Sequence, residues 1–263
     1  MIVSAIGVRA RPARSAIQAW SLRPVERACL LVGTVLMVSG LAHLVVFAVD
    51  GGRWYGPVSW RKPVTFGVSF GLTLVAVTWV ASYLRLAERT RRWLLGVLAV
   101  DCVVEVTGIT VQAWRRVPSH FNTVTAFDTV VAMSLAVGGA VLIVVLGSMA
   151  FTALRGRVDA PASMRLALRA GFALLMAGLA AGAAMIARGE VLIKSGHRAQ
   201  AYSAARSLKL VHGVTLNAIV VLPILAWLLG RMKRTETQRL RFVRVASVGY
   251  VMAAVAALVV SVR

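Results

Sequence analysis

Two acidic residues, Asp101 and Glu105, lie one helical turn apart inside a long apolar stretch of the sequence. At 100° per residue, Gly108 and Gln112 fall on the same face of a helix. Ionisable groups inside a membrane are costly and therefore mark functional sites by default. Two carboxylates at this spacing repel each other when both are ionised, so at least one should be protonated or paired with a cation. We expect a catalytic or proton-exchanging pair; the alternative is a structural pair satisfied by neighbouring helices.

Two histidines form a second candidate group. His43 lies near the end of the first apolar run and His212 near the start of the sixth, which places both at a similar depth. The hypothesis is that they bind a cofactor, haem b, between them. Lys209, Arg206 or Arg61 would then hold the haem propionates. The alternative for each histidine is a hydrogen-bonded core residue.

A third group consists of cations and amides near one end of the apolar runs. Arg61 and Lys62 precede Pro63, which suits the first position of a helix, and a helix N-terminus with two cations favours an anion. Snorkelling of both side chains to lipid phosphates is the alternative. The candidate substrate-binding or anion-binding residues are Arg61, Lys62, Gln112, Arg115, Arg116, His120, Asn122 and Lys209.

The stretch RRVPSHFNTV, residues 115–124, is the most polar short segment in the middle of the chain. We expect it to be a lid or rim over the acidic face, and not a plain connector. Asp128 is expected to pair with one of the nearby cations. Ser119 is interpreted as a cap of the following helix or as a turn residue.

The composition of the chain predicts which kind of structural element positions these residues. The chain has 263 residues, of which 59% are hydrophobic and 15% charged; soluble domains are nearer half apolar and a quarter charged. We predict an all-α, polytopic transmembrane bundle, because the apolar runs reach the roughly 20 residues that span a bilayer. Glycines four apart, at Gly67 and Gly71 and at Gly178 and Gly182, predict close helix packing. The seven predicted spans are 28–49, 63–85, 93–113, 126–154, 166–187, 208–230 and 242–262.

The distribution of lysine and arginine predicts the orientation. With the N-terminus in the cytoplasm, 19 of these residues lie on the inner side and 11 on the outer side, as the positive-inside rule requires. Residues 1–27 would form a basic cytoplasmic tail and residues 28–263 the seven-helix domain, with the C-terminus outside. The expected location is the inner (plasma) membrane. The chain has a net charge of +21, and its basic residues lie between the apolar runs. This placement favours contact with lipid headgroups over contact with nucleic acid.

Three stretches, GPVSWRKPVTFGVSFG, AWRRVPSHFN and LKLVHGVTLNAIVVLP, resemble motifs of an uncharacterised family of bacterial multi-pass membrane proteins. The resemblance runs from the first to the sixth span and implies the fold and the site positions, but no activity. That family often has a second histidine where this chain has Asn217. A weaker likeness, through Ser39-x-x-x-His43, is to the seven-helix zinc hydrolases of the alkaline-ceramidase and adiponectin-receptor superfamily; the paired late histidines of that pattern are missing here.

Four functions follow as hypotheses for this outward-facing polar site. The first is a haem or redox protein with His43 and His212 as ligands. The second is a metal-dependent hydrolase of a lipid or another anionic substrate, with zinc held by His43, His212 and either His120 or Asp128. The third is a proton-coupled transporter that uses the acidic pair. The fourth is an accessory membrane subunit whose polar residues only fix helix packing.

Overall fold

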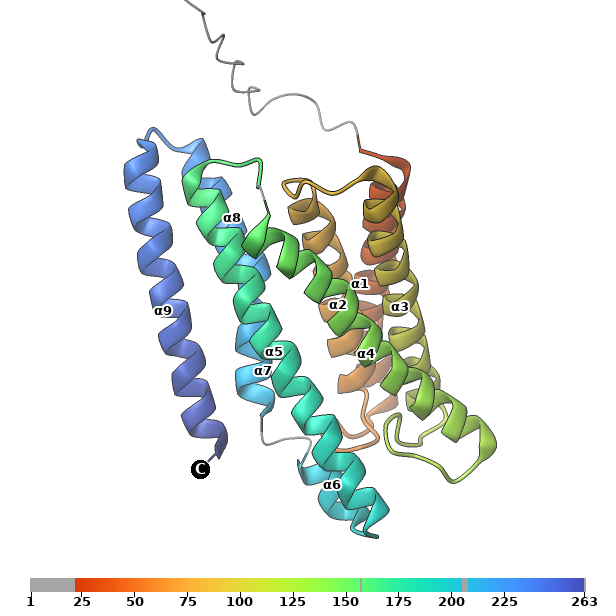
Figure 1. The fold of residues 1–263 in the computed structure, drawn as a ribbon. Helices are drawn as coiled ribbons and strands as arrows, with labels where there is room; N and C mark the ends of the chain where they lie inside the picture. Colours follow the sequence, from red (N-terminus) through yellow and green to blue (C-terminus); the bar gives the residue numbers. More distant parts are fainter. Residues whose placement is uncertain (1–21, 157, 205–207, 263) are drawn as a thin grey trace, which may run out of the picture.

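The protein is a bundle of long helices, described here from a computed structural model that covers residues 22–156, 158–204 and 208–262 (Figure 1). Within those residues no strand is present, so the predicted all-α class is confirmed. The helices are α1 (Pro24–Asp50), α2 (Arg61–Ala81), α3 (Glu88–Trp114), α4 (Ala126–Arg155), α5 (Ala162–Lys194), α6 (Arg198–Ala204), α7 (Lys209–Leu216), α8 (Ala218–Arg231) and α9 (Glu236–Val262).

Seven spans of the described chain are long and apolar enough to cross a membrane, with α7 and α8 together forming the sixth. Large apolar side chains such as Val35, Val45, Val137 and Val144 are exposed on their outer faces. This arrangement is that of a multi-pass membrane protein, as the composition predicted. Of the predicted basic tail, residues 1–21 lie outside the described residues.

All seven predicted spans are present, but several of their ends differ from the prediction. The first, third, fifth and seventh spans start four to six residues earlier than predicted, at Pro24, Glu88, Ala162 and Glu236. The second ends four residues earlier, at Ala81, and the fifth ends seven residues later, at Lys194. The sixth span, predicted as one helix, is interrupted at Asn217. There the amide side chain donates to the carbonyl of Gly213 at 2.7 Å, and Pro223 further along lacks the N–H that a regular helix needs.

The helices α1 and α2 pack closely through glycine. A Cβ added at Gly40 would lie 2.7 Å from the backbone nitrogen of Val68, and one added at Gly67 would lie 2.7 Å from the Cα of Gly40. Gly71 meets the carbonyl of Gly33 in the same way. The glycine pair predicted on α2 therefore permits backbone contact between two membrane helices.

The remaining helices complete two groups that share one core. The helix α3 packs on α1, α2 and α4, whereas α5 packs on α7, α8 and α9; contacts of α4 with α5 and of α2 with α8 join the groups. Gly178 and Gly182 on α5 face Thr215 and His212, so the second predicted glycine pair also lies at a close approach. Cys29 and Cys102 are free thiols buried in the core.

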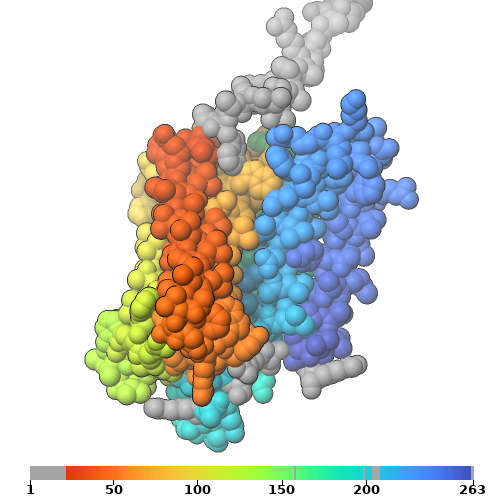
Figure 2. Space-filling view, turned by 180° about the vertical axis from the view of Figure 1, so that it is seen from behind, coloured from red at the N-terminus to blue at the C-terminus, as the bar shows by residue number. Residues whose placement is uncertain are grey.

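Three connections lie at the end of the bundle that is lowest in Figures 1 and 2, called the lower end below. They are the 51–60 loop, the 115–125 loop and the short helix α6, drawn in orange, yellow-green and cyan in Figure 2. The last residues of α9 also reach this end (Figure 1). Because α1 runs from the upper to the lower end, the two described ends of the chain lie on opposite sides of the bundle.

Candidate functional site

The acidic pair lies at the centre of α3, with Asp101 thirteen residues from either end of the helix. Both side chains are buried, with 7% of Asp101 and 4% of Glu105 exposed. They face α4, where an atom added to Gly138 would meet Oδ1 of Asp101 at 2.8 Å and Oε1 of Glu105 closer still. The Oδ2 atom of Asp101 is buried and has no hydrogen-bond partner among the described residues.

The same face of α3 continues toward the lower end through Gly108 and Gln112. Gly108 packs against Val131 and Leu135 of α4. Gln112 is fully buried, and its amide nitrogen donates to Oδ1 of Asp128 at 2.8 Å. The structure thus places the four residues of the predicted face against one neighbouring helix.

Asp128 is the centre of a closed polar network at the start of α4. It forms a salt bridge with Arg115, which also donates to Oε1 of Gln112 at 2.5 Å. The hydroxyl of Thr125 donates to Oδ2 of Asp128 at 2.7 Å and accepts from the Asp128 backbone N–H at 3.1 Å. Thr125 is therefore the cap of α4, and the alternative that Ser119 caps this helix is wrong. Arg115 and Gln112 have protein partners here, which favours a structural role for both.

Lys62 lies in a second polar cluster at the lower end, together with Ser119 and His120. Its ammonium donates to the hydroxyl of Ser119 at 3.2 Å, and Ser119 Oγ lies 2.9 Å from Nδ1 of His120. Lys209, at the start of α7, adds a second positive charge that acts on both Lys62 and His120. Residues from α2, the 115–125 loop and α7 thus converge on one small region.

Charge and burial keep the imidazole of this cluster neutral. Burial, and then the ammonium groups of Lys62 and Lys209, lower the pKa of His120 to about 3. A neutral imidazole can both donate and accept a hydrogen bond. The cluster therefore combines two cations with one neutral donor and acceptor.

Aromatic side chains surround His120. The ring of Phe66 on α2 lies 6.2 Å from it, and the ring of Phe121 lies 6.3 Å from both His120 and Tyr202 of α6. Phe121 also presses on Gly189 of α5, where a Cβ would overlap its ring. The 115–125 loop thus reaches from α2 to α5 and α6; that it forms a lid or rim over the acidic face stays a prediction.

The backbone of this loop is strained at two positions. Arg116 and Phe121 have φ values of 58° and 60°, a region that residues with side chains seldom adopt. Such strain persists only where the surrounding structure imposes it. Within the loop Asn122 is buried, and its side-chain oxygen accepts from the backbone N–H of Val124 at 3.2 Å. Asn122 thus shapes the turn and does not face an open site.

His43 has protein partners at both ring nitrogens. Nδ1 lies 2.7 Å from the carbonyl of Ser39, and Nε2 accepts from the indole N–H of Trp114 at 3.1 Å. The rings of Trp60 and Trp114 stand 6.1 and 6.3 Å away. Because Nδ1 donates and Nε2 accepts, His43 fits a hydrogen-bonded core histidine. To bind a haem iron it would have to give up its bond to Trp114.

His212 lies in the other group of helices, where Nδ1 is 2.7 Å from the carbonyl of Gly178. Its ring rests on Gly182 of α5, whereas His43 packs against α2 and α3. The geometry therefore gives no support to a haem held between the two histidines. The described residues also gather no set of three His, Cys, Asp or Glu side chains that would hold zinc. Arg206, the third candidate for the propionates, lies outside the described residues.

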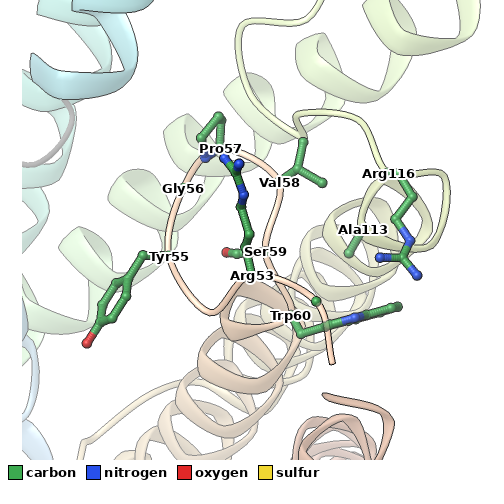
Figure 3. A pocket seen from close by; sticks show the side chains of 10 residues that line it. Arg53, Tyr55, Gly56, Pro57, Val58, Ser59, Trp60, Ala113 and Arg116 are labelled. Atoms are coloured by element: carbon green, nitrogen blue, oxygen red, sulfur yellow. The ribbon is translucent and has the colours of Figure 1, made fainter. Parts of the chain in front are cut away.

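The 51–60 loop lines an open pocket of about 430 Å³, together with Ala113 of α3 and Arg116 just after its end (Figure 3). Arg53 extends across the middle of the loop, whereas Tyr55 points away from it (Figure 3). Arg116 forms a salt bridge with Asp50 and lies over the Trp60 ring. The indole N–H of Trp60 also donates to Asp50 at 2.6 Å. Arg61 lies over the ring of Tyr55, so the two residues before Pro63 point to different partners.

Several residues of these clusters were not candidates from the sequence. Ser119 joins Lys62 to His120, Asp50 holds Arg116, and two tryptophans enclose His43. The signal that was present is the position of Trp60 and Trp114 beside basic residues in the SWRKP and AWRR stretches. Comparisons of the chain with protein-family models, with curated proteins and with solved structures found no match.

Proposed function

We propose that this protein is a membrane carrier of a small oxyanion, which binds at the lower end between Lys62, Ser119, His120 and Lys209. The observation that carries the proposal is Lys62 itself. Its ammonium is partly buried and hydrogen-bonded to a neutral hydroxyl, and no salt bridge joins it to an acid among the described residues. Burying a charge is costly unless a partner of opposite charge is present. An oxyanion supplies that partner and accepts charge-assisted hydrogen bonds.

Two arginines at the same end differ from Lys62, because each of them has an acidic partner. Arg115 is bound by Asp128 and Arg116 by Asp50. The fold therefore neutralises these two cations of the same end with carboxylates and leaves Lys62 beside a second lysine. The neutral imidazole of His120 adds a hydrogen-bond donor without adding charge.

Two features favour transport over binding alone. Thr65, Ser69 and Thr73 follow Lys62 on the same face of α2 and form a polar stripe that leads into the membrane; Thr65 and Ser69 are exposed. The sixth span, which begins at Lys209, is interrupted at Asn217. Interrupted spans beside a polar site are a common feature of secondary transporters.

The distribution of basic residues supports an orientation for this carrier. With the N-terminus in the cytoplasm of a cell bounded by an inner (plasma) membrane, the lower end faces outward. The binding site would then take its anion from the outer side. Arg53, which lies at the same end, would raise the local concentration of anions.

The test is uptake of radiolabelled phosphate, acetate and sulfate into proteoliposomes that contain the purified protein. We expect at least one of these oxyanions to enter faster than into protein-free vesicles, and Lys62→Met to abolish the difference. Arg61→Met is the matched control, because Arg61 is adjacent and lies over the Tyr55 ring; it should retain most of the uptake. Equal uptake by wild type and Lys62→Met would refute the proposal. If the protein instead binds vesicles of anionic lipid and takes up none of the three oxyanions, the carrier proposal fails and the cluster is a site for a lipid headgroup.

A further inference from the structure

The carboxyl pair of α3 is the feature of the core that the anion site does not use. Of the nine acidic residues in the chain, Glu26, Asp50, Glu88, Asp128, Asp159 and Glu236 form salt bridges. Among the described residues, Asp101, Glu105 and Glu190 form none. Glu190 lies near the end of α5, whereas Asp101 and Glu105 are buried in the middle part of α3. Their burial without a cation therefore needs a different form of neutralisation.

The helices around the pair offer no positive charge at its depth. On α4, no titratable residue lies between Asp128 and Arg155, and on α2 none follows Lys62 before the helix ends. The thiol of Cys102 interacts electrostatically with both carboxyl groups, and it adds no positive charge. Two buried carboxylates one helical turn apart cannot both remain ionised without a cation. At least one of them must carry a proton.

The packing around the pair indicates where that proton is held. Oδ2 of Asp101 is buried without a hydrogen-bond partner among the described residues, and Asp101 is more than nine-tenths buried. Oδ1 of Asp101 and Oε1 of Glu105 point at Gly138, where any side chain would collide with both carboxyl groups. The next residue, Gly139, has open space at the corresponding position. The glycine at 138 is thus required by the carboxyl groups, and not by helix packing in general.

We propose that Asp101 and Glu105 form a proton-binding site in the middle of the membrane, and that its occupancy controls how α4 packs on α3 through Gly138. With a proton bound, the pair carries at most one negative charge and α4 closes over it. When the last proton leaves, the two carboxylates repel each other against Gly138 and loosen this contact. One consequence of this inference rests on the proposed carrier function: a proton is moved together with the anion, or in exchange for it.

The site itself is tested without any transport, by infrared spectroscopy of the protein in lipid over a range of pH. We expect a C=O band of a protonated carboxylic acid at neutral pH in the wild type, and its loss in the double variant Asp101→Asn and Glu105→Gln. Glu190→Gln, which removes an acid of α5, is the matched control and should keep the band. Absence of the band from the wild type at neutral pH, or its persistence in the double variant, would overturn the proposal.

The role of Gly138 is tested with its neighbour as the control. Gly138→Ala should shift the carboxyl band, because the new methyl group displaces both side chains, whereas Gly139→Ala should leave the band in place. An unchanged band in Gly138→Ala would refute the closing of α4 on the pair. If Gly138→Ala fails to fold, amide hydrogen exchange of α4 around Gly138 in the wild type replaces it. Exchange should become faster as the carboxyl band is lost with rising pH, and unchanged exchange would refute the closing of α4 on the pair.

Coupling to transport is measured separately. An inward proton gradient should change the rate of anion uptake by the wild type several-fold, and this dependence should be lost in Glu105→Gln while anion binding at Lys62 persists. A gradient effect that survives in Glu105→Gln would contradict coupling through this pair. If the wild type transports no anion at all, the carrier proposal fails, and the infrared titration alone decides whether the proton site exists.

Discussion

Replacing Lys62 by methionine should make the protein more stable while it removes anion binding. Lys62 is partly buried, donates to Ser119 at 3.2 Å and lies near Lys209. An ammonium taken fully out of water costs several kcal/mol, so partial burial beside a second lysine costs about 2–3 kcal/mol. A long hydrogen bond from a charged donor returns about 1.5 kcal/mol. Methionine has a similar length and no charge, and we therefore expect a net gain of about 1 kcal/mol.

The assay is thermal unfolding of the purified protein in detergent, without added anion. A gain of this size raises the midpoint by about 2–4 °C for a chain of this length. Phosphate or another bound oxyanion should stabilise the wild type and leave Lys62→Met unaffected, since ligands stabilise only the state that binds them. Arg61→Met is the control and should change the midpoint little. A lower midpoint for Lys62→Met would refute the reasoning, because it would mean that the lysine is a structural cation with a partner in the fold.

Three further outcomes are expected from measurements of thermal stability. Gln112→Leu should destabilise the protein by about 1–3 kcal/mol, because its buried partners lose their hydrogen bonds; Arg85→Gln, at an exposed salt bridge, should have no measurable effect. Gly71→Val should cost about 1–3 kcal/mol by separating α1 from α2, whereas Gly96→Ala, which meets open space, should be tolerated. Because the pKa of His120 is lowered from 6.5 to about 3, stability should be complete above pH 6.5 and fall by up to about 1.4 kcal/mol per pH unit below it. His120→Asn should remove that slope, and an unchanged slope would place its origin elsewhere.

The fold was predictable because its signals are long and local. Each span is an apolar run of sufficient length, and glycine pairs such as Gly67 and Gly71 mark the closest helix contacts. The face of α3 that carries Asp101 and Gln112 also follows from helical periodicity. The interruption at Asn217 was not predicted, since Pro223 lies more than one turn beyond it and a proline alone does not place a break.

The pairing of the polar residues was less accessible, because pairing depends on which helices are neighbours. From the sequence, Asp128 had four candidate cations, and only the structure assigns it to Arg115. His43 and His212 were predicted to lie at a similar depth, but they belong to different groups of helices. A common depth fixes only the position of each residue along the membrane normal. It does not show that the two residues are neighbours, so it cannot predict a shared ligand.

Equilibrium binding of an inorganic oxyanion to the purified protein tests the central claim most directly. Radiolabelled phosphate and sulfate would be titrated against the wild type, Lys62→Met and Arg61→Met in the same detergent and at the same ionic strength. We expect saturable binding of about one oxyanion per chain to the wild type and to Arg61→Met, and at least a tenfold weaker affinity for Lys62→Met. Equal affinity in all three proteins, or no saturable binding to the wild type, would contradict an anion site built around Lys62.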